Sequence, residues 1–271
     1  MKPKGLFFLF LSLLFLFPSI SQANSRIVAS RHTPQDKWVT IQKRGKFIVG
    51  VKDNLPPLAF RDGDGNLTGF EIDIARGLAR ELLGDENAIS FVPLFNQQRL
   101  LAVINHQVDF VIASVTLNPS RQRVVDFSDY YYLSATGIVV KANSPFSSFS
   151  PPTLIAVLYY SRSIADIQYH LPQAKLRGVT SYQEALELME RGEIEAFAGD
   201  VTVLTGWIRE NPNYRLLPTI FGSYPLAIVF PKGRENQHLQ DKINQVIRRW
   251  KREGWLKERA RFWGLPTGVL Y

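Results

Sequence analysis

A helix–turn–strand pattern occurs twice in this chain of 271 residues, at 100–114 (LLAVINHQVDFVIAS) and at 186–200 (LELMERGEIEAFAGD). In each segment an amphipathic helix leads through a tight turn into a short apolar strand. Further strands and helices alternate along the chain, which predicts parallel sheets with right-handed crossovers and therefore an α/β fold. Each pattern ends on a polar residue directly after the strand, Ser114 in the first and Asp200 in the second.

These two strand ends predict a binding site. Ligands of open α/β sheets bind beyond the carboxyl ends of the strands. Two sheets that face one another would therefore enclose a cleft, with Ser114 on one wall and Asp200 on the other.

The other elements follow from hydrophobic periodicity. Helix 71–83 ends at Gly84, and Ser181-Tyr182-Gln183-Glu184 forms a capping box at the start of helix 181–191. The remaining expected helices are 97–105 and a long helix near the C-terminus. The expected strands are 46–51, 108–114, 127–132, 137–141, 154–158, 194–199 and 224–230.

The N-terminus is typical of a secretory signal peptide, residues 1–23, with early lysines, an apolar stretch at 5–17 and Ser21-Gln22-Ala23 at the cleavage site. The apolar stretch is too short to span about 30 Å of hydrocarbon. We therefore expect cleavage after Ala23 and a periplasmic protein, without a lipid anchor because no cysteine follows. Residues 24–43 are expected to form a leader segment of weak periodicity.

Composition excludes several kinds of chemistry. The chain has no cysteine, which excludes disulfides, thiol catalysis, iron–sulfur clusters and thiolate zinc sites. None of its four histidines lies at metal-ligand spacing from another, and the acids at 62–66 are followed by Leu67 where a calcium loop needs glycine, so we expect a hairpin turn there. We expect neither a metal nor a cofactor.

The net charge of +8 does not indicate nucleic acid. The only dense basic run, RRWKR at 248–252, is better explained as a solvated helix face, because an exported protein rarely meets nucleic acid.

The residues after Ser114 are suited to binding a carboxylate. Asn118 can cap a helix that begins at Pro119, which leaves free backbone N–H groups at the end of the strand. Thr116 adds a hydroxyl and Arg121 a planar guanidinium. The alternative is that Arg121 is a surface residue with a local partner.

Asp200 follows an apolar strand and is expected to be partly buried, so it needs a cation. A ligand ammonium would serve. The alternatives are an internal partner such as Arg162, or a capping role for the helix after Val201. A carboxylate site on one wall and an ammonium site on the other would together describe an amino acid.

Four stretches carry a resemblance to a known family: GKFIVGV at 45–51, LTGFEID at 67–73 after Pro57, VDFVIASVTLNPSRQRVVDFSDYY at 108–131, and GEIEA at 192–196 with Asp200. From about residue 45 to its end, the chain resembles the bacterial extracellular solute-binding proteins of family 3. These are the periplasmic receptors of polar amino-acid ABC transporters.

The resemblance implies a type II periplasmic-binding-protein fold. In this fold each of two lobes is a mostly parallel sheet flanked by helices, and two hinge strands join the lobes, which close on the ligand. The first lobe would comprise residues 24–136 and 225–271, and the second lobe residues 137–224. The implied partners are an amino-acid ligand and an inner-membrane ABC permease, and we expect a monomer without catalytic activity.

The resemblance also assigns roles to residues. Arg121 would pair with the ligand α-carboxylate, helped by Thr116 and the region of Ser161, while Ser114 and Asp200 would hold the α-ammonium. The chain departs from the family at 160–163, where YSRS replaces the usual Gly-Ser/Thr-Thr turn. Leu55 and Asn96 stand where many relatives have aromatic residues that sandwich the ligand.

Three further residues bear on which amino acid is bound. Lys52, Arg99 and Tyr182 resemble the acidic-amino-acid binders of the family, because added cations favour a second ligand carboxylate. Glutamate or aspartate is therefore expected, with glutamine or another polar amino acid as the alternative. The alternative for Lys52 is exposure to solvent.

An enzyme like the cyclohexadienyl dehydratases on the same scaffold is a further alternative, for which only Asp53 and Asp200 offer a general acid. A sensor or channel ligand domain would need a second membrane segment, and the sequence has none.

Overall fold

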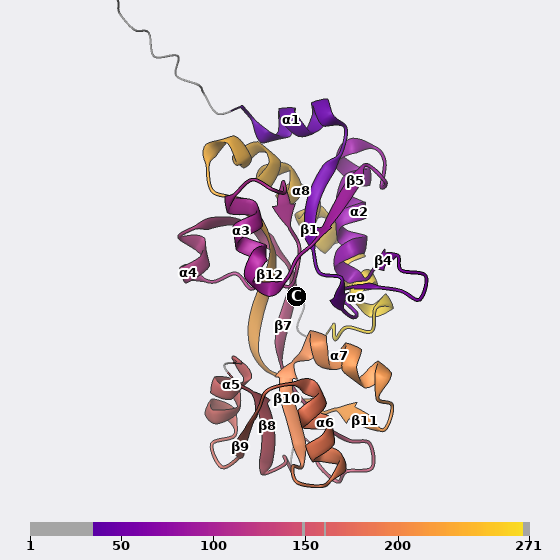
Figure 1. Ribbon diagram of the computed structural model, residues 1–271, viewed down its shortest axis with the longest axis vertical. Coiled ribbons are helices and arrows are strands. Elements are labelled where there is room, and N and C mark those ends of the chain that lie inside the picture. The colour runs from indigo at the N-terminus through magenta and orange to yellow at the C-terminus, as the bar shows by residue number, and fades with distance from the viewer. Residues whose placement is uncertain (1–34, 148–149, 160, 268–271) are drawn as a thin grey trace, which may run out of the picture. The chain divides into compact units, whose positions relative to one another are not determined.

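The computed structural model describes residues 35–147, 150–159 and 161–267, which belong to one compact unit (Figure 1). The signal peptide predicted at 1–23 lies outside the described residues. Through the first half of the described chain the elements are α1 (Lys37–Arg44), β1 (Phe47–Val51), β2 (Asn54–Leu55), β3 (Ala59–Arg61), β4 (Leu67–Thr68), α2 (Phe70–Leu83), β5 (Ile89–Pro93), the 3-10 helix η1 (Asn96–Gln98), α3 (Arg99–Ile104), β6 (Phe110–Val111), α4 (Pro119–Gln122) and β7 (Val125–Lys141). They are followed by β8 (Leu154–Leu158), α5 (Ser163–His170), β9 (Lys175–Val179), α6 (Tyr182–Glu190), β10 (Ala196–Asp200), α7 (Val201–Glu210), β11 (Tyr214–Leu216), β12 (Phe221–Pro231), η2 (Arg234–Asn236), α8 (Gln237–Glu253) and α9 (Trp255–Phe262).

Nine strands of the described chain form one sheet in the order β5-β1-β6-β12-β7-β10-β8-β9, with β11 paired to β7. The strands at each end of this order, β5-β1-β6 and β10-β8-β9, pair in parallel. Between them the long strands β7 and β12 run antiparallel to one another, as Figure 1 shows. This mixed α/β architecture confirms the fold class predicted from the sequence.

One continuous strand replaces two that the sequence predicted separately. The strands expected at 127–132 and 137–141 are both part of β7. The polar residues between them, Ser134 and Thr136, are buried, and their hydroxyls donate to Asp200 and Asp166. The strand therefore continues through a polar stretch because tertiary hydrogen bonds satisfy it.

Consequently the two expected sheets are joined into one by β7 and β12. The lobe boundaries predicted at 136/137 and 224/225 fall inside these two strands. The lobe boundaries stay a prediction, and the terms first lobe and second lobe denote those predicted ranges below.

Helix α1 corrects the expectation that residues 24–43 form only a leader of weak periodicity. Asp36 caps this helix by accepting from the backbone N–H of Trp38 at 2.8 Å. From α1, Lys37 (2.9 Å) and Arg44 pair with the carboxylate of Asp109, which is 1% exposed and also accepts from the backbone of Ile48 in β1. Long-range contacts that a local pattern cannot show thus hold α1 on the sheet.

Several local predictions are confirmed. Gly84 ends α2 in a left-handed conformation, and Ser181 caps α6 by accepting from the backbone N–H of Glu184 at 3.0 Å. The acidic segment 62–66 is a turn between β3 and β4, in which the Asp62 carboxylate accepts from two backbone N–H groups. The hairpin turn predicted for this segment is therefore confirmed.

Candidate ligand-binding site

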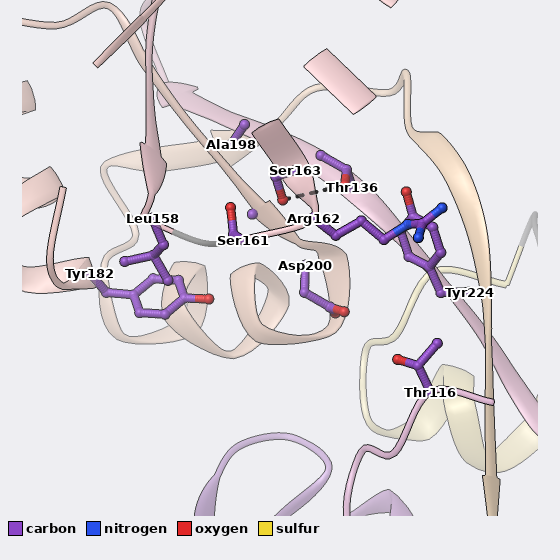
Figure 2. Close-up of a pocket in the computed structure, with 11 residues that line it drawn as sticks. Thr116, Thr136, Leu158, Ser161, Arg162, Ser163, Tyr182, Ala198, Asp200 and Tyr224 are labelled. Atoms are coloured by element: carbon purple, nitrogen blue, oxygen red, sulfur yellow. Dashed lines mark hydrogen bonds between the residues drawn. The ribbon is translucent and has the colours of Figure 1, made fainter. Parts of the chain in front are cut away.

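A cavity of about 170 Å³ lies where β10, α5, α6 and the segment after β6 approach one another (Figure 2). This volume far exceeds the ~15 Å³ that one water molecule needs. Four of the eight residues predicted for the site line it: Thr116, Ser161, Tyr182 and Asp200. The sequence did not place the other lining residues there, which are Thr136, Leu158, Arg162, Ser163, Ala198, Gly199 and Tyr224.

Asp200 ends β10 and caps α7. Its Oδ1 accepts hydrogen bonds from the backbone N–H of Thr202 (2.9 Å), the Thr202 hydroxyl (2.6 Å) and the Ser134 hydroxyl (2.8 Å). The alternative that Asp200 caps the following helix, α7, is therefore confirmed. The other alternative, an ion pair between Asp200 and Arg162, is not formed among the described residues. All three bonds converge on one oxygen, so the cap and a ligand contact through the other oxygen are compatible.

Tyr182 begins α6 and presents its phenol to the same cavity (Figure 2). Its ring packs edge-on against Phe197 at a centroid distance of 5.1 Å. Burial, and then the nearby Asp200 carboxylate, raise the pKa of the Tyr182 hydroxyl. The hydroxyl therefore stays protonated at neutral pH and is available as a hydrogen-bond donor.

Ser161 contributes a polar atom with no partner of its own. Its hydroxyl is buried and has no hydrogen-bond partner among the described residues, yet Ser161 lines the cavity. Buried hydroxyls are nearly always hydrogen-bonded, so this unsatisfied hydroxyl on a residue of the cavity wall is a candidate ligand contact.

A second group of predicted residues gathers around Ser114, away from the lining of that cavity. Ser114 has a left-handed backbone (φ 51°), which is uncommon for a residue other than glycine. Its N–H donates to Oε1 of Glu71 at 2.7 Å, and its carbonyl accepts from Nη1 of Arg99 at 3.0 Å. The backbone of Ser114 is thus held from both sides by charged side chains.

Glu71 is a residue of this region that sequence reasoning missed. Its carboxylate is fully buried, accepts from the Tyr131 hydroxyl at 2.5 Å, and leaves Oε2 without a partner among the described residues. Burial raises the pKa of this carboxyl above its ordinary value, against the opposing effects of its hydrogen bonds and of Arg99 and Lys52. The only signal in the sequence was its place in the stretch LTGFEID.

Lys52 and Arg99 are both largely withdrawn from solvent. Lys52 is 6% exposed and its Nζ donates to the carbonyl of Leu94 at 3.2 Å, so the alternative of a solvent-exposed lysine is wrong. Burial, and then repulsion by Arg99, lower the pKa of Lys52. Burial, and then repulsion by Arg121, likewise lower the pKa of Arg99, whose Nη1 also donates to the carbonyl of Ala113 at 2.7 Å. The region therefore concentrates positive charge in a poorly solvated setting.

Arg121 lies next to the Asp200 cavity but does not line it. Its Nη1 donates to the carbonyl of Thr116 at 2.7 Å, and its own N–H is capped by Asn118, as predicted. Its side chain borders a different cavity, of about 360 Å³, together with Arg99. In this structure Arg121 and Asp200 therefore do not face one shared cavity: Thr116 lines the cavity of Asp200, and Arg121 contacts the carbonyl of Thr116.

The described residues contain no group of three or more metal-ligating side chains placed to hold an ion. Within the same part of the chain, none of the helices has the length and apolar character needed to cross a membrane.

The mixed α/β fold, in which β7 and β12 connect the two parallel parts of the sheet, and the polar cavity beside these strands are typical of the two-lobed periplasmic binding proteins. The chain belongs to the bacterial extracellular solute-binding proteins, family 3, whose family model matches residues 47–266. The resemblance seen in the sequence is therefore confirmed, and with it membership of a family that binds amino acids for ABC transporters.

Individual relatives support the same assignment. The glutamine-binding protein of Geobacillus stearothermophilus is 32% identical over 200 residues, which cover 72% of this chain and 76% of the relative. The ABC transporter glutamine-binding protein GlnH of Bacillus subtilis (strain 168) is 28% identical over 242 residues, or 85% of this chain and 88% of the relative. A solved ancestral cationic amino acid solute-binding protein is similar with a TM-score of 0.70 and 28% identity, covering 83% of this chain and 98% of its own.

Proposed function

We propose that this protein is a periplasmic receptor that captures a polar L-amino acid and delivers it to an ABC permease, without catalysing a reaction. One observation carries the proposal. A carboxylate (Asp200) and an unpartnered buried hydroxyl (Ser161) from the second lobe meet a hydroxyl from the first lobe (Thr116) in one cavity. These groups complement the ammonium and carboxylate of an amino acid.

In this proposal Asp200 receives the α-ammonium, and Ser114, which lies outside the cavity lining, joins it when the lobes close on the ligand. The α-carboxylate is bound by Thr116 and Ser161, and Arg121 reaches it when its guanidinium leaves the Thr116 carbonyl. Such a ligand bridges the two lobes and favours the conformation in which they are closed. A transporter can then recognise that conformation.

We further propose that the preferred ligand is acidic, glutamate or aspartate. Lys52, Arg99 and Arg121 place three cations around Ser114, and Glu71 is the buried carboxylate that lies among them. With Asp200 and Arg162 of the cavity included, the cations outnumber these two carboxylates, and the excess of positive charge favours a ligand of net charge −1. Glutamine is the second candidate, because two relatives are named as glutamine-binding proteins.

Isothermal titration with the twenty proteinogenic amino acids tests the proposal. The purified protein is first unfolded in guanidinium and refolded, so that any amino acid carried through purification is removed. Glutamate or aspartate is expected to bind most tightly. Tighter binding of glutamine would select the second candidate, and the absence of binding to every amino acid would refute the function.

Two further measurements address the remaining parts of the proposal. N-terminal sequencing of the protein from a periplasmic fraction is expected to begin at Asn24. Incubation with prephenate or arogenate is expected to yield no aromatic product, and formation of that product would show an enzyme instead.

A further inference from the structure

A cation that the sequence pattern did not assign to the ligand lies in the cavity with Asp200. Arg162 immediately precedes α5, and it contributes the one guanidinium among the described residues that line this cavity. Figure 2 shows its side chain extending along the cavity wall to Tyr224. The side chain is exposed, and no carboxylate of the described chain forms an ion pair with it. An anion in the cavity can therefore reach it without displacing a partner.

Arg162 is nevertheless held in position. Its guanidinium carbon stacks 4.4 Å from the centroid of the Tyr224 ring. The Tyr224 hydroxyl donates to the carboxylate of Asp166, which also accepts from the Thr136 hydroxyl at 2.5 Å. Because Tyr224 belongs to β12 and Thr136 to β7, both of these strands hold the Tyr224 ring, over which the guanidinium lies, in position.

This placement suits recognition of a carboxylate. A guanidinium has five N–H donors, so one that packs over an aromatic ring can still offer a pair of N–H groups to a carboxylate. Fixing the side chain before binding also lowers the entropic cost of forming those bonds. Lysine or glutamine at this position would lack the planar fork.

We propose that Arg162 is a specificity-determining residue that binds a second carboxylate of the ligand, the one on its side chain, with Tyr224 as its positioning residue. This inference rests on the proposed function, in which Asp200, Thr116, Ser161 and Arg121 are already engaged by the α-ammonium and α-carboxylate. A ligand amide at the same place offers a single acceptor oxygen in place of two and carries no charge. Arg162 therefore selects glutamate over glutamine.

Titration of Arg162→Gln with L-glutamate and with L-glutamine tests this assignment. The affinity for glutamate is expected to fall about 10- to 100-fold, as for the loss of hydrogen bonds between charged groups, and that for glutamine by less than about threefold. Arg191→Gln is the matched control, since it removes an exposed arginine of the same lobe that pairs with Glu193 outside the cavity. It is expected to leave both affinities unchanged.

Tyr224→Leu provides a second test through the positioning residue. Removing the ring while keeping Arg162 is expected to lower glutamate affinity by a smaller factor and again to spare glutamine. Unfolding midpoints of all three variants, measured by circular dichroism, show that each is folded at the temperature of titration.

The possible outcomes separate the two proposals. An unchanged glutamate-to-glutamine ratio in Arg162→Gln overturns the role of Arg162, and so does an equal loss for both ligands, because that would place it on the shared α-carboxylate. A wild-type protein that prefers glutamine also overturns it, while leaving an amino-acid receptor. A wild-type protein that binds no amino acid refutes the proposed function itself.

Discussion

Replacing Asp200 by asparagine separates the two roles of this side chain. The Asp200 oxygen that accepts from Thr202 and Ser134 is kept by an asparagine carbonyl, and asparagine ranks with aspartate as a helix cap. The free energy of unfolding is therefore expected to change by less than about 1 kcal/mol. The ligand ammonium, in contrast, loses the one carboxylate among the described residues that line the cavity. Losing one member of a close charged pair costs about 2–5 kcal/mol, or about 30-fold to several thousand-fold in Kd.

The assay combines titration calorimetry with urea unfolding. Asp200→Ala is the comparison, because it removes both the charge and the cap that holds Thr202. It is expected to lose the same affinity and, in addition, about 0.5–2 kcal/mol of stability. An Asp200→Asn variant that binds its amino acid within threefold of wild type would show that the ammonium is held elsewhere and that Asp200 is not its partner.

Two further predictions concern the buried start of α2. Burial raises the pKa of the Glu71 carboxyl in the folded protein above its ordinary value of 4.5. At a pH between the unfolded and the folded pKa values, the folded protein therefore binds more protons than the unfolded chain. The free energy of unfolding then falls as the pH rises through this range. Lowering the pH from 8 to 5 is therefore expected to stabilise wild type relative to Glu71→Gln in urea unfolding, and parallel curves would contradict this. Gly69 has φ +126°, and a Cβ there would lie 2.4 Å from the carbonyl oxygen of Leu58. Gly69→Ala is expected to cost more than about 1 kcal/mol, whereas the control Gly63→Ala, in open space, should cost little.

Elements with local signals could be predicted from the sequence. The strand expected at 154–158 is β8 with the same bounds, and α6 begins directly after its capping Ser181. Gly84 ends α2 as expected. In each case the signal lies within a few residues of the element: an apolar run, a cap or a glycine that adopts a left-handed conformation.

Elements that depend on distant partners could not be predicted in this way. Helix α1 is held by Asp109, which lies 65 residues after Arg44 in the sequence. The continuity of β7 depends on hydrogen bonds from Ser134 and Thr136 to acids of the second lobe. The local pattern of hydrophobic residues cannot predict such contacts, because the partners become neighbours only in the folded chain.

The candidate site shows the same division. The types of residue in the site could be predicted, because a polar residue after each strand and the Asn118 cap are local features. The orientation of the side chains could not be predicted. The Arg121 guanidinium lies against the Thr116 carbonyl, and the burial of Glu71 arises from tertiary packing.

A crystal structure of the protein grown with L-glutamate would show the binding mode itself. We expect the ligand in the cavity lined by Thr116 and Ser161, with its ammonium at hydrogen-bond distance, ~2.7–3.2 Å, from the Asp200 carboxylate. A ligand bound without touching Asp200, or bound outside this cavity, would contradict this expectation.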